Sequence, residues 1–324
     1  MKNFKRMILC TSLAICILGT VSVPFIISSS SEVTTNDVSV IKTSDNDENS
    51  QNLITVPVSE KKTELTKDDV FYMMLNAQFN YDKISGKIAN GQTMDMPMCV
   101  DFSVDLADGG NYSKVTVNPV VLNESYSENL SADTDIIDEY KTDDCKKYEE
   151  HFIDKNGQAI NFNNLDRTKY VEKMFDSYDR DDVIKIDNEE RITEIEGEKC
   201  YCYVSNPMIT GYESICINPQ EMAFGFLEDQ SLWEITGETE YIGRKCLVIE
   251  GNTEQDYGSK LNVDKFSFLV DYETGILLKY TGFDIDGNLS DYMYAEEISF
   301  DYNKEMVKSL LAEKINLDYS EVQS

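Results

Sequence analysis

The side chains that could do chemistry in this chain are one histidine, eight cysteines and a large excess of carboxylates. A catalytic triad or a histidine-based metal site would have to be built around His151, the single histidine. The sequence contains no HExxH motif, no P-loop and no GxGxxG motif. A solvated histidine on a strand accounts for His151 better than a catalytic base does. We therefore predict no catalytic residue, no enzymatic activity, no metal and no other cofactor.

Six cysteines lie beyond the N-terminal segment, and an even number in an exported chain permits disulfides. We predict a hairpin of two strands, residues 200–205 and 212–217, whose register brings Cys216 nearly opposite Cys202. This pair is the best disulfide candidate. The alternative is that these thiols act as small buried apolar side chains in a reducing habitat.

The carboxylates make the chain strongly acidic, with 60 acidic and 29 basic residues and a formal net charge of −31. Such a surface repels phosphate backbones and anionic membrane surfaces, so nucleic acid is excluded as a partner. Contact with a membrane must then come from an apolar segment.

Such a segment lies at the N-terminus, where Lys2, Lys5 and Arg6 precede an apolar run. Residues 1–27 therefore form either a signal peptide or an N-terminal membrane anchor, because about 20 apolar residues are enough to span a bilayer and the serines at 28–31 suit a signal peptidase. Positive charge before the run places the rest of the chain outside the cytoplasm, anchored or secreted after cleavage. Residues 28–64 are a polar, acidic spacer that cannot bury a core and is expected to be disordered.

The composition changes at residue 65, and residues 65–303 are predicted to form one domain dominated by β-strands. Thr66 and Asp69 form a capping-box pattern at the start of a predicted helix, 67–79. We expect further helices at 166–178 and 220–228, a mobile loop or loosely packed helix at 123–148, and a helical C-terminal tail at 304–324. About ten or eleven strand candidates follow one another at a spacing typical of sandwiches and barrels: 81–89, 97–106, 112–118, 149–153, 158–162, 192–195, 200–205, 212–217, 245–250, 266–272 and 276–283.

The stretch from Trp233 to Phe300 contains the pattern WEI-G, Y-GRKC-VIEG, F-F-VD-ETGILLKY, D-DGNL-DY and EISF, in which glycine-containing turns separate apolar strands. This pattern resembles the C-terminal half of the bacterial superfamily of the periplasmic lipoprotein carriers LolA and LolB and the sigma-factor regulator RseB. The resemblance covers about residues 65–300. It implies a mainly β fold, a strongly curved antiparallel half-barrel covered by a few helices around an apolar cavity.

The resemblance also implies a function, that of an extracytoplasmic binding protein that holds a lipid or a lipid-modified ligand, such as lipoprotein acyl chains. Strands 266–272 and 276–283 are apolar on both faces, so both faces need a cover. Alternation and size select the candidate cavity residues Phe71, Met74, Trp233, Phe268, Val270, Leu278 and Tyr280. Two alternatives stay open, namely an envelope-stress regulator that acts on a membrane-bound anti-sigma partner and a structural or interaction module with a filled core.

Overall fold

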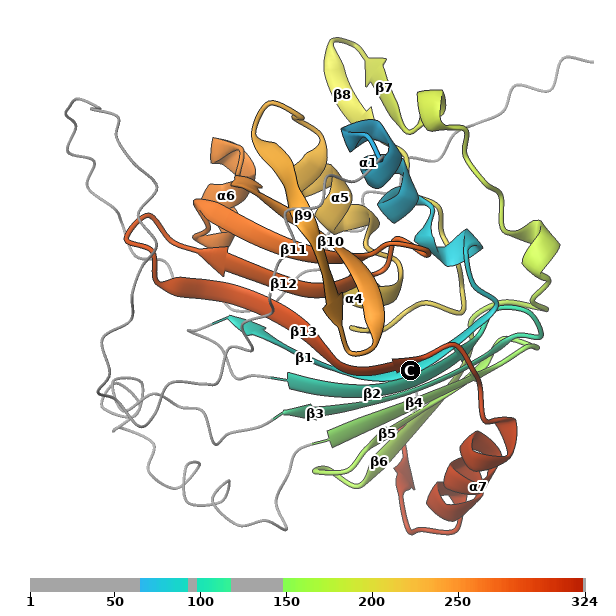
Figure 1. The fold of residues 1–324 in the computed structure, drawn as a ribbon. Helices are drawn as coiled ribbons and strands as arrows, with labels where there is room; N and C mark the ends of the chain where they lie inside the picture. Colours follow the sequence, from blue (N-terminus) through green and yellow to red (C-terminus); the bar gives the residue numbers. More distant parts are fainter. Residues whose placement is uncertain (1–64, 93–97, 118–147, 323–324) are drawn as a thin grey trace, which may run out of the picture. The chain divides into compact units, whose positions relative to one another are not determined.

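Strands dominate this structure, a computed structural model that describes residues 65–92, 98–117 and 148–322. Twelve strands form one open sheet in the order β14-β6-β5-β4-β3-β2-β1-β13-β12-β11-β10-β9, antiparallel apart from the β14–β6 pair. Figure 1 shows that the sheet is strongly curved. Its strands are β1 (Lys83–Gln92), β2 (Met98–Asp105), β3 (Gly110–Val117), β4 (Tyr148–Asp154), β5 (Gln158–Asn163), β6 (Thr168–Lys173), β9 (Trp233–Tyr241), β10 (Arg244–Asn252), β11 (Lys265–Asp271), β12 (Leu277–Phe283), β13 (Leu289–Ser299) and β14 (Ser320–Glu321). The predicted curved antiparallel sheet is confirmed.

Helices lie on both faces of the sheet (Figure 1). One face, here called the inner face, packs against α1 (Lys67–Leu75), α4 (Ser214–Ile217) and α5 (Gln220–Leu227). The opposite outer face packs against α7 (Lys304–Ile315). The remaining helical elements are η1 (Ala77–Phe79), η4 (Arg180–Asp182), η5 (Asn188–Glu190) and α6 (Gln255–Leu261). In the part of the chain that the structure describes, no helix is long and apolar enough to cross a bilayer.

The start of α1 follows the predicted capping box. The Thr66 hydroxyl accepts a hydrogen bond from the Asp69 amide at 3.1 Å, and the Asp69 carboxylate accepts one from the Thr66 amide at 2.8 Å. These two bonds satisfy backbone donors that a helix N-terminus otherwise leaves unpaired. The predicted helix 67–79 is interrupted at Asn76 and continues as the single turn η1.

Two sequence predictions about local structure are wrong. Residues 166–178 do not form a helix, because residues 168–173 pair with β5 as strand β6. The predicted 200–205/212–217 hairpin is also absent. Instead β8 (Glu198–Tyr201) pairs with β7 (Ile192–Ile195) across the short turn at Glu196 and Gly197, as a separate two-stranded sheet. In both cases the periodicity of the segment is ambiguous, and pairing with a neighbouring strand determines its conformation.

The loss of that hairpin removes the geometry on which the disulfide prediction rested. Residues 214–217 form helix α4, and both Cys202 and Cys216 are free thiols. Cys216 is fully buried, and burial raises its pKa. It acts as a small apolar core residue, as the alternative interpretation proposed.

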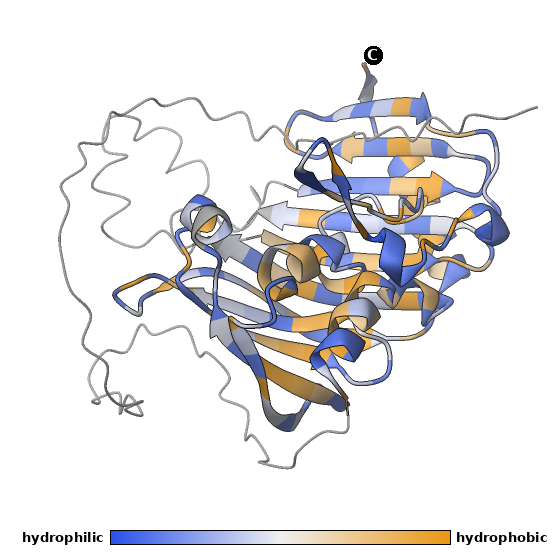
Figure 2. Ribbon diagram, turned by 90° about the horizontal axis from the view of Figure 1, so that it is seen from above, coloured by the Kyte–Doolittle hydropathy of each residue, from blue (hydrophilic) through white to orange (hydrophobic). Residues whose placement is uncertain are grey.

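Two hydrophobic cores result from this arrangement. The larger one lies between the inner face and helices α1, α4 and α5, and the smaller one lies between α7 and the outer side of β3, β4 and β5. Figure 2 shows hydrophobic and hydrophilic residues alternating along the strands, as expected where successive side chains point to opposite faces. All described residues belong to one compact unit. Predictions for residues 1–64 and for most of the 123–148 segment lie outside the described residues.

Candidate functional site

The seven predicted cavity residues lie together in the larger core. α1 contributes Phe71 and Met74, β9 contributes Trp233, and β11 and β12 contribute the others: Phe268, Val270, Leu278 and Tyr280. None of them exposes more than 4% of its surface. The sequence therefore selects side chains that the fold brings into one apolar compartment.

Helix α5 occupies the space that these residues surround. Its Phe226 ring lies with its centre 4.9 Å from that of Phe266, 5.2 Å from Phe268 and 5.3 Å from Tyr280. The Trp233 indole donates a hydrogen bond to the Leu227 carbonyl at 3.0 Å, which fixes the end of the helix. The sequence predicts the helix but not its position in the interior. The available signal is its composition, QEMAFGFL, because a helix that is apolar on most sides is expected to be buried.

One glycine allows α5 to approach its neighbours this closely. A Cβ atom at Gly225 would lie 2.2 Å from the ring of Tyr257 on α6, far inside van der Waals contact. The Tyr257 ring also packs edge-on against Phe226, with ring centres 5.1 Å apart. The compartment is thus closed by fitted aromatic side chains.

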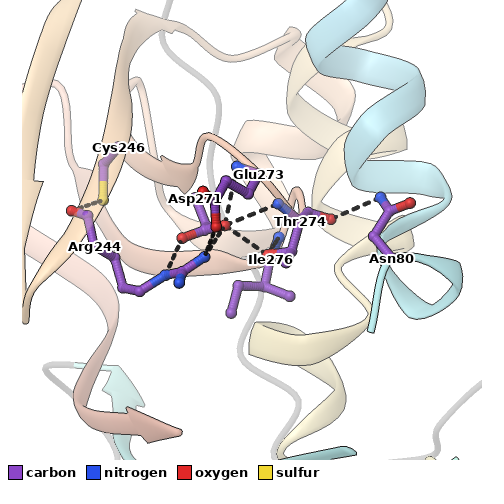
Figure 3. A network of polar contacts seen from close by, with 7 residues as sticks. All are labelled: Asn80, Arg244, Cys246, Asp271, Glu273, Thr274 and Ile276. Atoms are coloured by element: carbon purple, nitrogen blue, oxygen red, sulfur yellow. Dashed lines mark hydrogen bonds and ion pairs between the residues drawn. The ribbon is translucent and has the colours of Figure 1, made fainter. Parts of the chain in front are cut away.

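A polar network fixes the turn between β11 and β12 (Figure 3). The Asp271 carboxylate is fully buried and accepts hydrogen bonds from Arg244 Nε at 2.7 Å and Arg244 Nη2 at 3.0 Å. It also accepts bonds from the backbone amide and the hydroxyl of Thr274, at 2.8 and 2.7 Å. Burial alone would raise the pKa of Asp271, but the hydrogen bonds from Arg244 and Thr274 hold it below its ordinary value. The Asn80 amide donates to the Thr274 carbonyl at 3.0 Å, which joins the turn to the end of η1.

Arg191 is a fully buried cation that the sequence predictions did not single out. Its guanidinium donates to the Cys202 carbonyl at 2.8 Å, to the Gln220 side chain at 2.9 Å and to the Leu75 carbonyl. Burial lowers its pKa to about 10. These bonds tie the end of α1 and the start of α5 to the segment after β8, so Arg191 has a structural role. A lone arginine between Glu190 and Ile192 gives no signal of this in the sequence.

The inner face changes from apolar to polar in β3–β6. Register places Ser113, His151, Asn161 and Tyr170 in one row across these strands, and Glu149, Asn163 and Thr168 in the next. His151 Nδ1 and Asn161 Oδ1 lie 2.6 Å apart, and the Asn163 amide donates to Glu149 at 3.1 Å. We call these two rows the polar inner face. A pocket of about 320 Å³ lies on it, lined by Glu149, His151, Asn161, Phe162, Asn163, Thr168, Tyr170 and Val322.

This surface has the groups for binding but not the arrangement of a triad. His151 contacts an amide where a catalytic base would contact a carboxylate that orients it. Among the described residues, no group of three or more histidine, cysteine or acidic side chains is arranged to hold a metal ion. The amide side chains each carry donors and an acceptor, so they suit a ligand that offers both. The sequence signal for this surface is the alternation within residues 148–154 and 158–163.

Comparisons with known proteins give likenesses of fold. No family model matches the chain, and no curated protein matches it. Among solved structures, the chain is similar to an uncharacterized conserved protein from Thermus thermophilus, with 6% identity and a TM-score of 0.35 over 80% of this chain and 100% of that one. It is also similar to the MucA/MucB complex structure from Pseudomonas aeruginosa, with 11% identity and a TM-score of 0.34 over 72% of this chain and 56% of that one.

A third similar structure is a LolA superfamily protein from Nitrosomonas europaea, with 9% identity and a TM-score of 0.21 over 75% of this chain and 97% of that one. The strand and turn pattern predicts a LolA-type fold, and this structure shows a likeness to a LolA superfamily protein. At these TM-scores it identifies neither a ligand nor a partner for this chain.

Proposed function

We propose that this chain is a non-enzymatic, extracytoplasmic binding protein that holds a segment of another protein on its polar inner face. The observation that carries the proposal is the contrast between the two halves of the inner face. Helix α5 fills the apolar half, whereas the polar half carries a pocket of about 320 Å³. The filled half then serves as a rigid scaffold for the polar half.

A polypeptide suits the chemistry of the polar inner face. Asn161 and Asn163 each combine amide donors with a carbonyl acceptor, and an extended backbone offers N–H and C=O groups in alternation. His151 and Tyr170 add an imidazole and a ring at either side of Asn161. Residues 1–27, as a signal peptide or an anchor, would bring the domain to the outer side of the membrane, so a membrane-bound protein, such as the anti-sigma partner of a stress regulator, is the class of partner we expect.

Site-directed photocrosslinking in cells tests this proposal. A crosslinking amino acid at Tyr170 should give one discrete adduct with another protein, whereas the same group at Ile184, which is 78% exposed and lies outside the polar inner face, should not. Replacing Asn161 and Asn163 by aspartate should abolish the Tyr170 adduct, because it adds two charges where amide donors are needed. Equal adducts from both positions, or an adduct that survives the double substitution, would refute the proposal.

The aromatic compartment favours a second candidate function, the binding of a lipid or a lipid-modified segment. The Phe226 ring lies against Phe268 and Tyr280, two of the residues selected for a hydrophobic ligand, so an acyl chain or lipid-modified segment would find apolar contacts there if it replaced this side chain. Native mass spectrometry of the purified protein tests this. A lipid at one copy per chain, with more bound in a Phe226→Ala variant, would support it, and spectra without lipid for both proteins would exclude it.

A further inference from the structure

The β7–β8 hairpin stands outside the twelve-stranded sheet (Figure 1), and Tyr201 at its end and Tyr203 just after it pack on Phe224 of helix α5. The rings of Tyr201 and Tyr203 each lie with their centres 5.0 Å from that of Phe224. Phe224 is itself buried, so it gives both tyrosine rings a fixed packing surface on their buried side. The two rings are therefore held in place before any partner arrives.

Both tyrosines nevertheless leave much of their surface in solvent. Tyr201 is 38% exposed and Tyr203 is 50% exposed, while Ile195 on the same hairpin is 49% exposed. Tyrosines with a fixed ring lose little conformational entropy on binding, and this residue type is enriched in the centres of protein interfaces. Burial and the nearby Glu221 carboxylate raise the pKa of Tyr203 to about 12, so its ring is neutral at physiological pH.

Carboxylates surround these rings. Glu228 accepts hydrogen bonds from the Tyr201 hydroxyl at 2.7 Å and from Lys199 at 2.6 Å, and Glu254 lies close enough to act on both of these groups. Glu221 acts on both Tyr203 and Tyr257. Further exposed carboxylates occur on the hairpin and just before it, at Glu189, Glu190, Glu194, Glu196 and Glu198. Lys199 is the one exposed basic residue between positions 189 and 203.

We propose that Tyr201, Tyr203, Glu221, Glu228 and Glu254 form a docking surface for a segment of a partner protein that carries lysine or arginine. The chemistry is that of cation–π contact with the exposed rings, combined with attraction to the carboxylates around them. An acidic segment would be repelled, and a neutral apolar one would leave Glu221 and Glu254 without the counter-charge that Lys199 already gives Glu228. This surface is separate from the polar inner face, and the inference does not depend on the function proposed for that face.

Fluorescence anisotropy with the full-length protein tests the inference. The probe is a labelled, unstructured peptide of four arginines spaced by glycine and serine, and the comparison peptide replaces each arginine by neutral citrulline. At a salt concentration of about 0.15 M, where distant charges are screened, the arginine peptide should bind and the citrulline peptide should bind much more weakly. Equal affinity for the two peptides would overturn the inference.

Substitutions distinguish binding at this surface from attraction to the overall negative charge of the protein. The double variant Tyr201→Ser/Tyr203→Ser should bind the arginine peptide about fivefold to thirtyfold more weakly, the effect of two exposed cation–π contacts. Tyr203→Phe keeps the ring and should bind within about twofold of the wild type. Tyr212→Ser removes a tyrosine of similar exposure, 51%, outside the proposed surface and should leave the affinity for the arginine peptide unchanged.

A double serine variant that binds as tightly as Tyr212→Ser would show that the peptide is held by net charge alone and would overturn the inference. If the double variant fails to fold, hydrogen exchange on the wild type replaces it. The arginine peptide should then protect backbone amides within residues 198–205. Protection absent from this segment, while the peptide is bound, would equally overturn the inference.

Discussion

Replacing Asp271 by asparagine removes the charge at the centre of the network in Figure 3 with little change in shape. The carboxylate is fully buried, and its two bonds to Arg244 form a bidentate pair. Asparagine can accept one of these bonds, but its NH₂ group faces donors where the second carboxylate oxygen stood. The variant therefore leaves Arg244 and Thr274 incompletely paired.

The size of the effect follows from the burial of the two partners. Breaking a fully buried ion pair by removing one side costs about 3–5 kcal/mol. Arg244 is 23% exposed and keeps Glu273 as a second acceptor at 2.9 Å, so its charge is partly compensated after the substitution. We therefore expect a loss of about 2–3 kcal/mol in the free energy of unfolding at pH 7, or roughly 5–10 °C in Tm for a unit of this size.

The pH dependence of this loss tests the explanation. Because the folded-state pKa of Asp271 is lowered, its stabilisation is present above the unfolded pKa, about 3.9, and is lost as the pH falls through the folded pKa. Urea denaturation of the wild type and the variant from pH 7 downward should thus show a difference that shrinks below about pH 4. Asp286→Asn, at an exposed turn, is the control and should change stability by about 0.5 kcal/mol or less. A difference that stays constant down to the lowest pH at which the wild type folds would refute the reasoning.

Three further predictions concern the core, the outer helix and a buried acid. Phe226→Ala should lower the free energy of unfolding by about 3–5 kcal/mol in chemical denaturation, because it empties the centre of the aromatic compartment. Lys314→Met should lower the free energy of unfolding by about 3 kcal/mol, because it leaves the buried Glu150 carboxylate without its cation. The double variant Lys314→Met/Glu150→Gln should regain part of this loss, because the unpaired charge is then removed. Burial raises the pKa of Glu213, so the folded state binds the carboxyl proton more tightly than the unfolded state does, and stability falls as the pH rises through the folded pKa. In thermal melts, Glu213→Gln should therefore be more stable than the wild type at pH 7. This advantage should be lost near pH 4, where the wild-type carboxyl is protonated in the folded state.

Local chemistry allowed several features to be predicted from the sequence. The Thr66 capping box, the strands at 149–153 and 158–162 and the strands separated by glycine-containing turns after Trp233 all depend on residues close together in the chain. The wrong predictions have a common cause. Residues 168–173 and 198–201 are short segments without decisive periodicity, and each became a strand because a neighbouring strand offered backbone hydrogen bonds.

The sequence by itself determined which side chains are buried around β11 and β12, because alternation and size identify apolar strand faces without reference to a partner. Tertiary structure alone decided what covers them, since a core has to be filled to close packing and any apolar element of suitable shape can do this. Here that element is α5, brought to the compartment by the close approach at Gly225. The tyrosines on Phe224 likewise come from a segment that no local pattern connects to α5, whereas the polar inner face is formed mostly by the consecutive strands β4, β5 and β6.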